Sequence, residues 1–120
     1  MSEILIDHVL LDRVTKAAKE SPRLRMNYNF HESLSSPSQR LLNALEPGTV
    51  LPIHRHRHTA ETYVLLRGRM RVLFYDDDKK EINRYELDPA EGTYGVNIPR
   101  GQWHTIEVLC AGTVIFEVKD

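Results

Sequence analysis

Three of the six histidines in this 120-residue chain, His54, His56 and His58, lie within five residues, and Glu61 follows. In an extended segment, residues two apart face the same side, so the imidazoles of His54 and His56 can converge on one point. The step to Glu61 is long enough for a turn into a new strand. Two neutral imidazoles and one carboxylate suit a divalent transition metal better than calcium or magnesium. This pattern predicts a metal site.

His104 is the candidate for a fourth ligand, because it follows a tight turn and begins another predicted strand. A lone histidine beside a tryptophan is more often packed or exposed than bound to a metal, so spacing alone does not assign it. His58 lies where the turn toward Glu61 begins, and we expect it to be exposed or to contact a ligand rather than to bind the metal.

Short strands must position these side chains. Alternation of apolar and polar residues, broken by turn signals rich in glycine, proline and aspartate, recurs along most of the chain. No helical pattern separates these runs, and their spacing favours an antiparallel sandwich or barrel. The predicted strands are 39–45, 49–54, 61–67, 69–75, 82–87, 93–98, 103–108 and 113–118.

The N-terminal region has a different period. Apolar residues between positions 4 and 19 recur at steps of three and four, which predicts an amphipathic helix within residues 1–21. Asp7 is a possible N-cap, and Pro22 ends the helix. The chain has the length of one domain, 1–120, in which the helix precedes a β-barrel over residues 23–118. The expected fold class is all-β with an N-terminal α-helix.

Residues 23–31 alternate polar and large apolar side chains, which predicts a further strand. Its polar side either faces water at a sheet edge or lines a polar cavity. In a cavity, guanidinium groups would bind carboxylate or phosphate and the amides would bind hydroxyls, so the ligand would be a small anionic or sugar-derived molecule. The candidate ligand-binding residues on this strand are Arg23, Arg25, Asn27 and Asn29, followed by His31.

Composition excludes several classes of partner. The chain has 16 Lys and Arg against 17 Asp and Glu, a formal charge of -1, so it lacks the basic excess of a nucleic-acid or membrane-surface protein. No apolar run approaches the roughly 18 residues of a membrane span. Cys110 is the only cysteine, and residues 1–7 lack the features of a signal peptide. We therefore expect a cytoplasmic protein in a reducing compartment.

Two motifs carry a resemblance to a known superfamily. The run Gly48-x5-His54-x-His56-x4-Glu61-x6-Gly68 matches the first cupin motif at every fixed position and spacing. Residues 92–108 resemble the second cupin motif, but they have one extra residue before Pro99, and they have Val108 where the motif usually has asparagine.

The cupin resemblance implies a double-stranded β-helix, or jelly-roll barrel, with a metal inside it. By this resemblance the metal ligands are His54, His56, Glu61 and His104. The cofactor would be one divalent transition metal: iron, manganese, zinc or nickel.

A narrower resemblance involves Arg25-x-Asn27-x-Asn29-x-His31 and residues 39–48. These segments look like the WbuC-like cupin metalloproteins of bacterial O-antigen and surface-polysaccharide gene clusters. The resemblance favours a cavity-facing polar strand and implies a setting in polysaccharide biosynthesis.

The leading functional hypothesis is a metal-dependent enzyme that isomerises or epimerises a carbohydrate-derived anion, with the metal as Lewis acid. His31 and Tyr63 are the candidates for the proton-transfer residue, and Trp103 for an aromatic contact with the ligand, although such aromatics are more often core residues. Two alternatives stay open: an iron-dependent dioxygenase and a barrel that binds a metabolite without catalysis. Apolar side chains at Val72, Phe74 and 115–116 suggest a homodimer.

Overall fold

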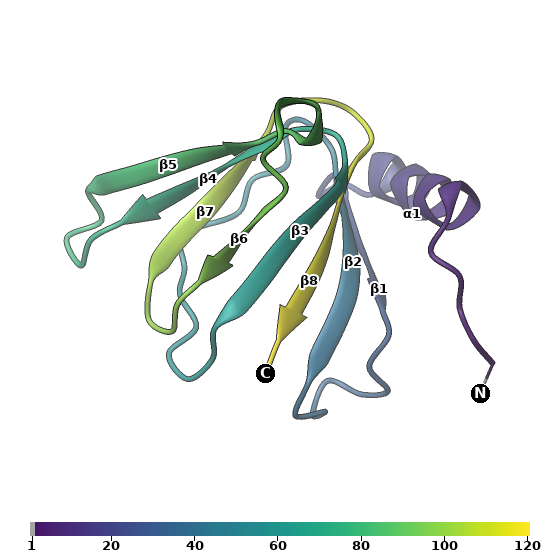
Figure 1. Ribbon diagram of the computed structural model, residues 1–120, viewed down its shortest axis with the longest axis horizontal. Coiled ribbons are helices and arrows are strands. Elements are labelled where there is room, and N and C mark those ends of the chain that lie inside the picture. The colour runs from purple at the N-terminus through teal and green to yellow at the C-terminus, as the bar shows by residue number, and fades with distance from the viewer. Residues whose placement is uncertain (1) are drawn as a thin grey trace.

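The computed structural model describes residues 2–120, in which one α-helix precedes two antiparallel sheets (Figure 1). The all-β class with an N-terminal helix is thereby confirmed. The elements are α1 (His8–Glu20), β1 (Arg25–Asn29), β2 (Gln39–Leu45), β3 (Glu61–Arg67), β4 (Met70–Tyr75), β5 (Glu81–Leu87), the 3-10 helix η1 (Pro89–Glu91), β6 (Gly95–Ile98), β7 (Trp103–Val108) and β8 (Thr113–Lys119).

The strands form a five-stranded sheet in the order β1-β2-β8-β3-β6 and a three-stranded sheet in the order β5-β4-β7. Successive residues of a strand point to opposite faces, so alternate side chains of both sheets meet in a shared core. This core contains apolar residues from both sheets, and it lies between them. Its fully buried members include Leu45, Met70, Val72 and Ile115.

The helix begins later than its apolar period suggests. Asp7 has an extended backbone, and its carboxylate accepts a hydrogen bond of 3.0 Å from the amide of Leu10, so α1 begins at His8. Asp7 is thus the N-cap, as predicted, while residues 2–7 are not helical, so the predicted range 1–21 is wider than the helix, and Met1 lies outside the described residues. Within residues 2–120, no helix has the length and apolar character needed to cross a membrane.

The outer face of the five-stranded sheet is covered by α1, which lies beside β1 and β2 in Figure 1. Leu10, Val14 and Ala18 of the helix pack against Leu42 and Val114 of the sheet. The opposite face of the sheet is turned toward the three-stranded sheet. The helix therefore closes one face and leaves the inner face to the site.

Strand β1 lies at the edge of its sheet, and its two sides differ as the alternation predicts. Tyr28 packs with the helix cluster, whereas Arg25, Asn27 and Asn29 lie opposite inward-facing residues of β2. Directly opposite residues share a face, so the polar side of β1 is turned toward the inner side of the sheet. Asn27 and Asn29 are nevertheless exposed because no strand lies beyond β1.

The segment 49–54 does not form the predicted strand: only His54 makes a bridge, to His104. Pro52 has no N–H to donate to a ladder. Side chains hold the segment instead, since Thr105 Oγ1 donates to the Leu51 carbonyl at 2.8 Å. Side-chain contacts thus replace the hydrogen-bond ladder of a strand in the residues just before His54, the first predicted metal ligand.

Gly68, the last residue of the first motif, has a positive φ of 95°. A Cβ at this position would lie 2.2 Å from Thr113 Oγ1. Only glycine satisfies both the left-handed backbone and this close approach between the β3–β4 turn and the start of β8.

Candidate metal centre

The two ligand-bearing segments are hydrogen-bonded to each other. The amide of His54 donates to the carbonyl of His104 at 3.0 Å, and the amide of His104 donates back at 2.9 Å. The amide of Gly101 donates to the His56 carbonyl at 2.8 Å. Glu61 is the first residue of β3 in the five-stranded sheet, whereas His104 lies on β7 of the three-stranded sheet. These contacts bring the two motifs to one place.

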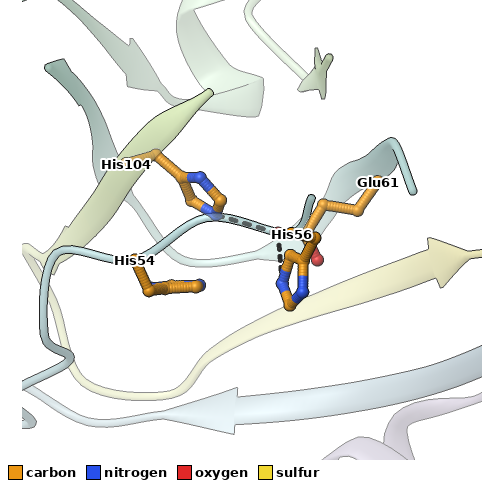
Figure 2. Close-up of side chains that lie close together, drawn as sticks. All are labelled: His54, His56, Glu61 and His104. Atoms are coloured by element: carbon orange, nitrogen blue, oxygen red, sulfur yellow. Dashed lines mark hydrogen bonds and ion pairs between the residues drawn. The ribbon is translucent and has the colours of Figure 1, made fainter. Parts of the chain in front are cut away.

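The four predicted ligands converge in the structure. Figure 2 shows His54, His56, Glu61 and His104 directed toward one another, and one ligand atom from each lies within 4.8 Å of all the others. Glu61 and His104 are only 4% and 1% exposed. His54 and His56 are half-buried, so the centre has a closed side and a partly open side.

Backbone carbonyls fix which imidazole nitrogens face the centre. Nδ1 of His54 lies 2.9 Å from the Pro52 carbonyl oxygen, and Nδ1 of His104 lies 2.8 Å from the Gln102 carbonyl oxygen. Because a carbonyl only accepts, each Nδ1 carries the hydrogen, and each Nε2 has a free lone pair when the ring is neutral. This is the tautomer that a metal ligand requires.

Two imidazole nitrogens lie close to the same carboxylate oxygen, Glu61 Oε1. Nε2 of His104 lies 2.9 Å from this oxygen, and Nε2 of His56 lies 3.4 Å from it. The lone pairs of neutral imidazole rings repel the negatively charged carboxylate oxygen that they face, unless a proton or a cation lies between them. Three imidazole nitrogens and one carboxylate oxygen are a donor set that fits a divalent transition metal.

The protonation states also favour a metal. Burial acts to raise the pKa of Glu61, but a hydrogen bond from His104 and the positive charge that His56 and His104 carry when protonated outweigh it, so this pKa falls below its ordinary value. Burial lowers the pKa of His56. At neutral pH Glu61 is therefore a carboxylate and His56 a neutral ring, the forms that bind metals.

The side chain of Tyr63 contacts Glu61, one of the four candidate metal ligands. Its hydroxyl donates to Glu61 Oε1 at 3.0 Å. Burial raises the pKa of Tyr63, and the charges of Glu117 and Glu61 raise it further, so the hydroxyl keeps its proton. In this arrangement Tyr63 orients Glu61. Its predicted part in proton transfer stays a prediction.

His31 is not brought to the centre. It is buried, and its Nδ1 lies 3.2 Å from the amide of Arg40, which donates to it. It lines a separate surface cavity of about 280 Å³ with Ser36 and Pro37, and none of the four candidate ligands lines that cavity. The catalytic role predicted for His31 finds no support in this position.

The polar residues in and just before β1 fall into two groups: Arg25 holds a neighbouring loop, and the others are exposed. The Arg25 guanidinium donates to the Val50 carbonyl at 3.0 Å and to Thr49 Oγ1 at 3.4 Å, so it holds the loop that leads to His54. Arg23 and Asn27 are exposed, as is Asn29. The predicted ligand contacts of these residues stay predictions.

Trp103 faces away from the centre, because its neighbour on β7, His104, faces inward. Its ring lies 4.5 Å from the guanidinium carbon of Arg55 and 4.8 Å from Lys79 Nζ, measured to the ring centroid. Trp103 is therefore placed apart from the ligand site predicted for it. Arg55 is half-buried, and His58 is exposed, as predicted, and outside the ligand set.

A half-buried polar pair near the centre was missed by the sequence interpretation. Asn43 Nδ2 donates to Glu117 Oε1 at 2.9 Å. Burial raises the pKa of Glu117 to about 7, although the bond from Asn43 acts in the opposite direction. The available signal was parity: Glu117 shares a strand face with Ile115, and Asn43 shares one with Leu45, both fully buried.

Comparison with known proteins assigns the family. The model of a family described as a domain of unknown function, DUF6016, matches residues 6–87, more than half of the chain. The chain belongs to the DUF6016 family. No curated protein matches this DUF6016 protein.

Solved structures similar to the DUF6016 protein identify its fold. The cupin domain of Cnp3 from Schizosaccharomyces pombe matches with a TM-score of 0.62 and 11% identity, over 79% of this chain and 63% of that one. The capsular polysaccharide assembling protein CapF from Staphylococcus aureus matches with a TM-score of 0.66 and 22% identity, over 82% of this chain and 26% of CapF. Oxalate decarboxylase of Bacillus subtilis, which has Mn(II) centres, matches with a TM-score of 0.60 and 22% identity, over 80% of this chain and 24% of that one. The DUF6016 protein thus has a cupin fold, and it spans less than two thirds of each of these chains.

Proposed function

We propose that this DUF6016 protein binds one divalent transition metal and uses it as a Lewis acid on a small sugar-derived ligand, in an isomerisation or epimerisation. The observation that carries the proposal is the convergence of four ligand atoms within 4.8 Å, two of them on buried side chains. The ligands are His54, His56, Glu61 and His104.

The ligand count supports a reactive site. Four protein ligands leave one or two positions open on a metal that prefers five or six, and an open position separates a reactive site from a structural one. When bound, the metal would polarise a carbonyl or hydroxyl oxygen of the ligand. The chain itself supplies a fixed ring orientation at His54 and His104, a hydroxyl that holds Glu61, and an apolar barrel that limits water.

The carbohydrate class and the setting rest on two likenesses. CapF, one of the similar structures, is described as a capsular polysaccharide assembling protein. The run from Arg25 to His31 resembles the WbuC-like cupins of surface-polysaccharide gene clusters. We therefore propose a role in the cytoplasmic steps of surface-polysaccharide biosynthesis.

Association into a homodimer needs a different surface from the one first expected. Val72 and Ile115 are fully buried within the chain, and Phe116 packs with the helix cluster, so they do not need a partner. Exposed apolar side chains lie instead at Ile82 and Tyr85 on β5. We keep a homodimer as a proposal, which sedimentation velocity of the parent protein tests directly.

Elemental analysis tests the metal site. The protein would be purified without a metal-affinity column and compared with the His104→Ala variant. We expect about one iron, manganese, nickel or zinc per chain in the parent and a loss of most of it in the variant, since His104 is the most buried ligand. Iron would direct the next test to oxygen uptake, and zinc or manganese to sugar isomerisation. Folded parent protein that holds no metal and takes up none when divalent ions are added would reject the proposal.

A further inference from the structure

One polar pair interrupts the apolar inner face of the five-stranded sheet. Glu117 on β8 lies on the same face as Ile115, and Asn43 on β2 lies on the same face as Leu45. The two residues are 74 positions apart in sequence, yet Asn43 Nδ2 donates to Glu117 Oε1 at 2.9 Å. Neither residue belongs to the metal cluster, and neither has a part in the proposed function so far.

The pair lies beside the metal centre. Glu117 is directly opposite Tyr63 on β3, and the next inward residue of β8, Lys119, is directly opposite Glu61. Opposite residues share a face, and diagonal neighbours lie about 7–8 Å apart, so Glu117 and the ligand Glu61 face the same space.

The pair has unused hydrogen-bonding capacity. Asn43 Oδ1 is buried and has no hydrogen-bond partner in the structure. Over residues 2–120, the bond from Asn43 is the one side-chain hydrogen bond that the Glu117 carboxyl receives. Buried acceptors without partners are rare in folded proteins because they lose their contacts with water. A bound ligand would supply the missing contacts.

A buried polar pair can often be replaced by apolar residues of similar size at no cost in stability, or with a gain. The rise in the pKa of Glu117, to about 7, reflects its removal from water; Glu61 raises it further and Lys119 opposes the rise. A half-buried polar pair that interrupts an apolar strand face is typical of a functional site.

We propose that Asn43 and Glu117 form a hydroxyl-binding subsite inside the barrel, which holds a polyhydroxylated ligand of the sugar class next to the metal. This inference rests on the proposed function, which it deepens by naming the part of the ligand that is recognised. One ligand hydroxyl can donate to Asn43 Oδ1 and accept from Glu117 when that carboxyl is protonated; when Glu117 is a carboxylate, a second ligand hydroxyl donates to it. A second anionic group on the ligand would be disfavoured here because Glu61 and Glu117 already face this space.

Two ring carboxylates test the subsite. Metal-loaded protein would be titrated by calorimetry with D-glucuronate and with cyclohexanecarboxylate, which has a six-membered ring and a carboxylate but no hydroxyls. We expect the parent to bind D-glucuronate about tenfold more tightly, the effect of one or two hydrogen bonds. The double variant Asn43→Leu, Glu117→Met keeps side-chain size, so it should lose this preference, bind cyclohexanecarboxylate as the parent does, and unfold at the same or a higher temperature.

A matched variant, Asn97→Leu with Glu107→Met, changes the same residue types at exposed positions and should keep the preference. The subsite is rejected if the parent shows no preference, if the inner double variant keeps it, or if that variant unfolds at a clearly lower temperature, which would make the pair structural. Metal uptake judges the proposed function separately. If the parent binds no metal, that function fails, and the same preference measured on metal-free protein decides the subsite.

Discussion

The two faces of the five-stranded sheet have different compositions. The outer face packs Leu42, Ala44 and Val114 against helix α1, and every one of these side chains is fully buried and apolar. The inner face mixes buried apolar residues with Glu61, Tyr63 and the Asn43–Glu117 pair. The same strands supply both faces. We infer that the outer face provides stability, and that the inner face gives up some stability for chemistry.

The largest effect is expected where the outer face is broken. Leu42 is fully buried between β2 and α1, so Leu42→Ala removes apolar contacts and leaves a cavity. The free energy of unfolding should fall by about 3 kcal/mol. Metal content per folded chain should stay at the parent value, because Leu42 faces away from the centre. Urea denaturation with elemental analysis measures both, and a loss of metal from folded protein would contradict the separation of the two faces.

On the inner face we expect the reverse of the Leu42→Ala result: a loss of metal affinity with a smaller loss of stability. Tyr63→Phe removes the hydroxyl that donates to Glu61 Oε1 at 3.0 Å, but it keeps the ring in the core. Metal affinity should fall about tenfold, the low end of what partners of metal ligands contribute. The free energy of unfolding of the metal-free protein should fall by about 1.5 kcal/mol, the low end for a hydrogen bond to a charged group. Competition with a chelator measures the affinity, and an unchanged value would show that Tyr63 does not orient Glu61.

The helix cap offers a test on the outer side. Asp7→Ala removes the acceptor for the Leu10 amide and should lower the free energy of unfolding by about 1 kcal/mol. Metal affinity should not change. Asp7→Asn, which keeps a capping oxygen, is the control and should recover most of the loss. If Asp7→Asn is as unstable as Asp7→Ala, the cap is not the cause.

The last effect concerns pH. The folded-state pKa of Glu117 is raised to about 7 from an ordinary 4.5, so its contribution to stability is greatest below pH 4.5 and is lost as the pH rises through 7. The melting temperature of the metal-free parent should therefore gain a few degrees on that of Glu117→Met as the pH falls from 8 to 5. Comparing the two proteins cancels the titration of the histidines. A constant difference across this range would mean that Glu117 titrates normally.

Local patterns predicted most of the fold, and the cupin resemblance predicted the full ligand set. The strands 39–45, 61–67 and 103–108 agree with the structure at both ends, because a period of two and a turn signal are properties of neighbouring residues. The ligand spacing is similarly local, and the convergence of His54, His56, Glu61 and His104 follows the cupin resemblance. The helix start was placed too early because the apolar period continues through residues that the Asp7 cap excludes from the helix.

Long-range placement could not be predicted in the same way. His31 has the right residue type for catalysis, but the turn after β1 takes it to another cavity. Asn43 and Glu117 meet only because β2 and β8 pair, and no local pattern connects two residues 74 positions apart. Segment 49–54 has the alternation of a strand, but Pro52 and contacts from other elements decide its conformation.

The reciprocal backbone bonds between His54 and His104 make the two cupin motifs one cooperative unit. Opening either segment breaks both bonds, so the two amide protons should be slowed by the same factor relative to an unfolded chain, set by a single local unfolding event. A ligand that binds the closed form lowers that rate in proportion to its free concentration over its dissociation constant. Hydrogen exchange at two backbone positions would thus report occupancy of the centre without any knowledge of the reaction.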